Sequence, residues 1–156
     1  MSDLHSTLSS TLTDHYTRNL SRIRELATPL SEEQFWQKPF PFGNSFGHLV
    51  LHLTGNLKYY IGAQIAESGY VRDRPREFSD PNPPSKQEAL KRLDEAVAMV
   101  LATIREQSPE DWASQYSGAG AEAEYRLDMV IQCTGHMQHH IGQMIYLGYE
   151  WKRRRD

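Results

Sequence analysis

The chain of 156 residues has little of several features that would each favour a particular class of protein. Its one cysteine, Cys133, excludes an intrachain disulfide and any zinc site built from several cysteines. It has no apolar run of about 18 residues, and residues 1–20 are too polar for a signal peptide. Charge of neither sign dominates: the net charge of −3 favours neither nucleic acid nor an anionic membrane as a partner. We therefore expect a soluble, cytoplasmic protein.

Apolar residues recur at helical spacing in four segments, separated by connections rich in proline and glycine. The predicted helices are residues 2–27, residues 45–69, residues 85–107 and residues 126–148. The second should begin after an N-cap at Asn44 or Ser45 and end at Gly69, and the third opens with Ser85 and Glu88 in a capping-box pattern. Residues 112–125 are ambiguous and could pair as a small hairpin.

The connection of residues 70–84 contains four prolines and is long enough to run the length of a helix. The second and third helices therefore need not be antiparallel neighbours. We predict an all-α protein with a single domain over residues 1–156. Its expected architecture is an up-down-down-up four-helix bundle with a long crossover between helices two and three.

Seven histidines are the unusual feature of the composition. His136 and His140 lie four residues apart near the apolar face of the last helix, so their side chains are about 6 Å apart. Two imidazoles placed in this way can reach one metal ion at about 2.0–2.1 Å. His52 lies on the inner stripe of the second helix, and helix bundles build metal sites from facing helices. The sequence predicts a three-histidine metal site; the alternative is a set of core or surface histidines.

Two further histidines lie beside these three. His48 precedes His52 by four residues, so a four-histidine site is an alternative, although His48 shares its helix face with Leu51 and Gly55 about as well. His139 points about 100° away from the next residue along the helix and should be exposed.

The remaining polar neighbours limit the chemistry. The second ring N–H of a ligand could be accepted by Gln132 or Gln143, and Asn56 could form a polar wall of the site. Met137 stands where a zinc protease of the HExxH type has its glutamate base, which argues against peptidase activity. Cys133 is expected to be a small buried hydrophobic residue rather than a ligand.

Several short motifs occur in a fixed order along the chain. They are Asn44-Ser45, His52-Leu53, Gly55-Asn56, Arg72-Asp73-Arg74, Glu77-Phe78, and His136 followed by His140-Ile141-Gly142-Gln143. Together they resemble the DinB-like superfamily, which includes bacillithiol-transferase-like proteins, over nearly the whole chain. The resemblance implies an up-down-down-up four-helix bundle with metal ligands at His52, His136 and His140. It gives no role to the positions of His48 and His139.

Characterised members of that superfamily include transferases and isomerases that use low-molecular-weight thiols such as bacillithiol or mycothiol. There the metal is thought to bind and activate the thiol. Three neutral imidazoles would leave a divalent ion with open positions, as in catalytic sites. We expect zinc or nickel, with iron and copper also suited to imidazole.

The functional prediction is a metal-dependent thiol transferase or hydrolase that acts on a small molecule, with no catalytic residue assigned. The alternative is a metal-binding stress-response protein without turnover. Family members often pair, so a homodimer is a further expectation.

Overall fold

The computed structural model describes residues 3–156, and helices form nearly all of its regular structure. The four long helices are α1 (Leu4–Ala27), α3 (Phe46–Leu57), α5 (Lys86–Glu106) and α7 (Arg126–Arg153). A π-helical segment, η1 (Lys58–Ala63), continues α3, and the short helices are α2 (Glu32–Trp36), α4 (Arg76–Ser79) and α6 (Pro109–Trp112). Residues 3–156 contain no strand, so the all-α prediction is confirmed. None of the helices over this range is long and apolar enough to cross a membrane.

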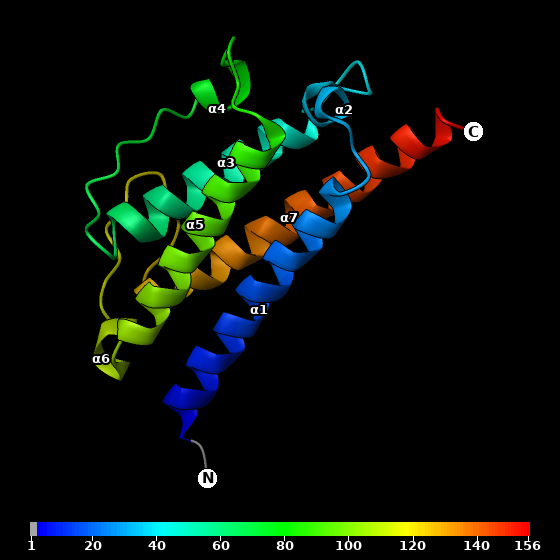
Figure 1. Cartoon of the computed structure of the whole chain (residues 1–156). Coiled ribbons are helices and arrows are strands. Elements are labelled where there is room, and N and C mark those ends of the chain that lie inside the picture. The colour runs from blue at the N-terminus through cyan, green and yellow to red at the C-terminus, as the bar shows by residue number, and fades with distance from the viewer. Residues whose placement is uncertain (1–2) are drawn as a thin grey trace.

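The four long helices lie beside one another (Figure 1), and their buried apolar side chains form one hydrophobic core. Helix α1 contacts α5 and α7, and α3 contacts the same two helices. Each long helix turns an apolar stripe inward, which places Tyr16, Leu53, Val97 and Met137 in the core. Because α3 and α7 are direct neighbours, a side chain on one can meet a side chain on the other.

Local sequence fixes where these helices begin. Asp3 accepts a hydrogen bond from the third backbone N–H after it and caps α1; the predicted start at residue 2 lies outside the described residues. Ser45, rather than the residue before it, caps α3. Ser85 caps α5, but the carboxylate of Glu88 pairs with Arg92 at 2.8 Å, so only half of the predicted capping box forms.

The second predicted helix differs from the expectation of a regular helix as far as Gly69. The α-helix ends at Leu57 and continues as the π-helical segment η1, and Gly69 lies beyond it with φ +74°. Within η1, the hydroxyl of Tyr59 donates to the carbonyl of Ala119, and that of Tyr60 donates to Gly120, both at 3.4 Å. These contacts join η1 to the segment before α7.

The last helix is longer than predicted and the hairpin is smaller. Helix α7 runs through residue 148 to Arg153, and Glu150 pairs with Arg153 and Arg154 across its final turn. Between α6 and α7 the backbone forms one isolated bridge, Gln115 with Tyr125, instead of two paired strands.

Candidate metal centre

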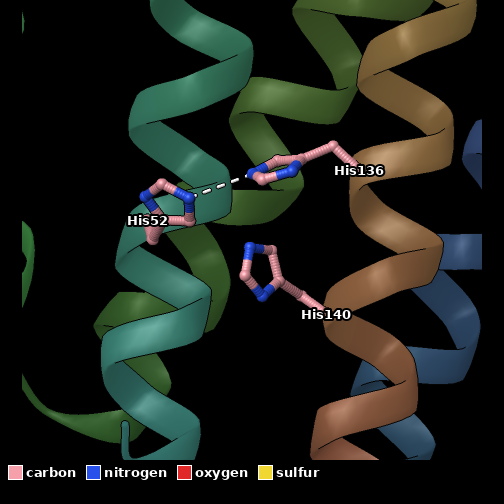
Figure 2. Close-up of side chains that lie close together, drawn as sticks. All are labelled: His52, His136 and His140. Carbon is pink, nitrogen blue, oxygen red and sulfur yellow. Dashed lines mark hydrogen bonds between the residues drawn. The ribbon is translucent and has the colours of Figure 1, made fainter. Parts of the chain in front are cut away.

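Three histidines meet where α3 faces α7. Helix α3 carries His52, and α7 carries His136 and His140 one turn apart, all pointing into the same space (Figure 2). One nitrogen from each imidazole lies within 4.8 Å of those of the other two. The Nε2 atoms of His52 and His136 are 3.0 Å apart. These three residues are called the three-histidine cluster below.

The outer nitrogen of His52 is held by a buried ion pair. Glu77 Oε2 lies 2.8 Å from His52 Nδ1, and Arg72 donates to both carboxylate oxygens, to Oε1 at 2.7 Å and to Oε2 at 3.0 Å. The side chains of all three residues are at least nine-tenths buried. Burial alone would raise the pKa of Glu77, but the bonds from His52 and Arg72 outweigh burial and lower the pKa below its ordinary value. The carboxylate is therefore ionised, and Nδ1 of His52 carries the proton that it accepts.

A glycine makes room for this ion pair. Glu77 lies on the short helix α4, which packs against α3. A Cβ atom on Gly55 would lie 2.1 Å from Glu77 Oε1 and 3.4 Å from Arg72 Nε. Gly55 therefore permits the carboxylate to reach His52, which explains a glycine inside α3 despite its cost of about 1 kcal/mol relative to alanine.

The outer nitrogen of His140 is held differently. Its Nδ1 lies 2.7 Å from the amide oxygen of Gln143, three residues along α7. An amide oxygen only accepts, so Nδ1 is the donor and Nε2 keeps its lone pair. That Nε2 atom is buried and has no hydrogen-bond partner among residues 3–156. A buried, unpartnered lone pair beside two other imidazoles fits a metal ion.

His136, the third histidine of the cluster, is held by the fewest hydrogen bonds. No hydrogen bond holds Nδ1 of His136 within the described part of the chain, and its Nε2 contacts only His52. Because Nε2 of His52 has a lone pair, the 3.0 Å contact requires Nε2 of His136 to donate. A cation between the two nitrogens would replace that proton.

The imidazoles of α7 are held neutral by their surroundings. Burial, followed by the neighbouring His140 and His52, lowers the pKa of His136 to about 4. Burial also lowers the pKa of His140, although its bond to Gln143 acts in the opposite direction. Neutral imidazole is the form that binds metals, so these two side chains are ready to bind at neutral pH.

A cavity of about 520 Å³ opens beside the cluster and is called the His136 cavity below. Its walls include Asn56, Tyr60, Gln132 and His136. Asn56 is 7% exposed, and its amide oxygen has no partner within residues 3–156. The expected polar wall at Asn56 therefore borders a space from which a small molecule could approach His136.

Of the other predicted neighbours, His48 lies apart from the cluster, whereas the ring of His139 lies with its centroid 5.0 Å from that of His140. His48 is half-buried, and its Nδ1 lies 2.9 Å from the hydroxyl of Ser45. His139 is exposed, as expected. Of the two glutamines weighed as acceptors, Gln143 holds a cluster histidine, whereas Gln132 donates to Asp128 at 3.0 Å.

Cys133 is buried, as expected, and lies at the wall of the His136 cavity. Its thiol contacts the sulfur of Met129 at 3.5 Å, and burial raises its pKa to about 12. A thiol with so high a pKa is a poor nucleophile and a poor metal ligand at neutral pH.

Arg72 and Glu77 belong to the motifs of the family resemblance, but their positions in the sequence predict no role for them. They lie in the connection between the second and third predicted helices, where no periodicity indicates orientation. One signal was available: a histidine that binds a metal usually donates its other N–H to a carboxylate, a backbone carbonyl or water. Applied to His52, this rule makes an acidic residue a candidate acceptor. Glu77 is such a residue and belongs to a motif of the same resemblance.

Comparisons with known proteins agree with this architecture. A family model described as the DinB superfamily matches residues 15–144. The crystal structure of a conserved protein from Enterococcus faecalis aligns with a TM-score of 0.74 and 16% sequence identity, and the alignment covers 91% of this chain and 95% of that one. At this identity the likeness concerns the fold alone. A search of curated proteins found no match.

Proposed function

Because the chain belongs to the DinB superfamily, we propose that it binds a divalent metal ion through His52, His136 and His140 and acts as an enzyme on a small molecule. The ions proposed are zinc and nickel, which imidazole ligands suit. The reaction proposed is a thiol-dependent transfer or a hydrolysis.

The convergence of the three imidazoles carries the proposal. Glu77 and Gln143 fix the tautomers of His52 and His140, so both present Nε2 lone pairs toward His136. Two lone pairs aimed at one point are unfavourable unless a proton or a cation lies between them. Neutral His136 has one N–H, which it gives to His52, so the lone pair of His140 stays without a partner. A divalent cation would satisfy all three imidazoles.

One chemical argument and one observation support turnover. A bound divalent ion with three imidazole ligands would supply Lewis acidity and acidify a bound thiol or water. The His136 cavity lets a small molecule approach His136 along a wall that includes Asn56 and Gln132.

One observation favours the alternative, a metal-binding protein without turnover. Glu77 contacts His52 through one oxygen and Arg72 through both, so it is not free to act as a general base. No other carboxylate within residues 3–156 makes a hydrogen bond to the cluster. A reaction at this site would therefore depend on acidification by the ion.

The helix order and the oligomer belong to the same proposal. We infer an up-down-down-up bundle, with α1 and α7 running in one direction and α3 and α5 in the other. The neighbour contacts of α1 and α3 and the course of the chain in Figure 1 support this order.

A homodimer is proposed from the family resemblance. Analytical ultracentrifugation would measure the molecular mass of the protein in solution and so test this proposal.

Metal analysis tests the proposal. Protein purified without a histidine tag should take up one zinc or nickel ion per chain, and His52→Ala, His136→Ala and His140→Ala should each lose tight binding. The matched controls are His48→Ala and His139→Ala, which should keep one ion per chain. Equal loss from His139→Ala would contradict the ligand assignment. Transfer of a low-molecular-weight thiol to an electrophile, abolished by chelation, would separate the enzyme from the non-catalytic alternative.

A further inference from the structure

A second cavity, of about 450 Å³, shares His139 with the wall of the His136 cavity. Its walls are formed mainly by large apolar side chains of the loop before α3, of α3 and of α7: Phe40, Phe42, Leu49, Tyr146 and Leu147. We call this the apolar cavity. Concave sites with apolar walls and a few polar groups are typical binding sites for small molecules.

The mouth of the apolar cavity is preformed. The rings of Phe40 and Phe42 stack, with their centroids 5.4 Å apart and their planes within 6°. Arg154, at the end of α7, donates a hydrogen bond to the carbonyl of Pro39 and so ties this loop to the helix. Phe42 and Tyr146 nevertheless remain 72% and 71% exposed. Two exposed aromatic rings at the edge of one cavity are typical of a surface that binds a ligand or a partner.

The polar wall of the apolar cavity leads to the three-histidine cluster. Gln143 lines this cavity and also accepts the hydrogen bond from His140 at 2.7 Å. His139 lines both the apolar cavity and the His136 cavity. A molecule in the apolar cavity would therefore touch the residue that orients a cluster histidine. A protein partner needs no such connection, whereas a substrate of the cluster does.

We propose that the apolar cavity binds the aromatic or branched aliphatic part of the small molecule on which the cluster acts. This inference rests on the proposed function and names its substrate class. Within it, His139 is not a metal ligand: it lies at the junction of the two cavities and helps to set which molecules fit.

A titration on metal-free protein tests the cavity itself. The probe is 4-fluorotoluene, followed by ¹⁹F NMR, with 4-fluorobenzoate as a charged molecule of similar size. We expect saturable binding of 4-fluorotoluene to the wild-type chain and much weaker binding of 4-fluorobenzoate. Phe42→Ala removes one exposed aromatic wall and should weaken binding about fivefold. The matched control is Tyr125→Ala, because Tyr125 is an aromatic residue that is 44% exposed and lies outside the cavity wall.

Three results would overturn the inference. The first is no saturable binding of 4-fluorotoluene, and the second is equal weakening by Phe42→Ala and Tyr125→Ala. The third is self-association of the wild-type chain that Phe42→Ala abolishes while 4-fluorotoluene does not bind, which would assign the cavity to a second copy.

A paramagnetic measurement tests the connection to the cluster. In protein loaded with Co²⁺, the ¹⁹F relaxation of bound 4-fluorotoluene should be faster than in protein loaded with Zn²⁺. Equal relaxation in the two loaded forms would place the probe far from the ion and overturn the substrate assignment. If neither ion binds, the proposed function fails, and the metal-free titration still decides whether the cavity binds apolar molecules.

Discussion

The two sides of the three-histidine cluster are supported in opposite ways. On the α3 side, His52 donates to a carboxylate that is buried and neutralised by Arg72, in an arrangement that depends on a separate segment of the chain. On the α7 side, His140 donates to the neutral amide of Gln143, three residues away on the same helix. One side is set by tertiary contacts and charge, the other by helical spacing.

This difference has a chemical consequence. A carboxylate acceptor makes an imidazole a stronger ligand than an amide acceptor does, because it stabilises positive charge on the ring. His52 should therefore be the strongest of the three ligands and His136, with no acceptor for Nδ1 within residues 3–156, the weakest. The weakest ligand borders the His136 cavity, where exchange of small molecules would take place.

The largest difference between the two sides is expected when the hydrogen-bond acceptors Glu77 and Gln143 are removed one at a time. Glu77→Leu leaves Arg72 buried without its partner and should lower the free energy of unfolding by about 3–5 kcal/mol. It should also weaken metal binding about 10–100-fold. Gln143→Leu removes the neutral acceptor of the Nδ1–H of buried His140 and leaves no buried charge unpaired, so stability should fall by only about 1 kcal/mol. Urea denaturation and competition with a chelator measure both effects, and equal losses for the two variants would show that charge on the α3 side has no special role.

The two sides of the cluster should lose their contributions to stability over different ranges of pH. The pKa of His136 is lowered to about 4 in the folded state, below the value of about 6.5 expected in the unfolded chain. The unfolded state therefore takes up protons first, and metal-free protein should lose about 1–3 kcal/mol as the pH falls from 6.5 to 4. The pKa of Glu77 is lowered from 4.5, so its contribution is present above pH 4.5 and is lost only at lower pH.

Urea denaturation in the presence of a chelator, at a series of pH values, measures these contributions. His136→Gln should flatten the loss between pH 6.5 and 4. If the variant keeps the wild-type slope over that range, the acid sensitivity lies elsewhere in the chain.

The same contrast explains how far the sequence could predict the structure. The four long helices follow from apolar residues at helical spacing, and the pairing of His136 with His140 follows from a spacing of four. The role of Gln143 could be predicted for the same reason, because Gln143 lies on the same helix as His140. Local geometry therefore predicts the α7 side.

The α3 side depends on information that spacing does not contain. Glu77 reaches His52 because α4 folds back onto α3, and no periodicity in residues 70–84 indicates this path. The π-helical segment η1 was also missed, since its contacts come from Tyr59 and Tyr60 to the distant carbonyls of residues 119 and 120. Both features involve tertiary contacts between segments that are distant in the sequence, which local spacing does not predict.

The smallest effect expected comes from adding one methyl group to each side. Gly55→Ala would place Cβ 2.1 Å from Glu77 Oε1, and that oxygen cannot move freely because Arg72 holds it at 2.7 Å. We expect a loss of about 1–2 kcal/mol in the free energy of unfolding, although alanine favours helix. The matched control on α7 is Gly148→Ala, which meets nothing within 4 Å and should gain about 0.5–1 kcal/mol. Thermal denaturation of the metal-free variants measures both, and a gain in Gly55→Ala as large as in Gly148→Ala would mean that Glu77 can withdraw from His52 without cost.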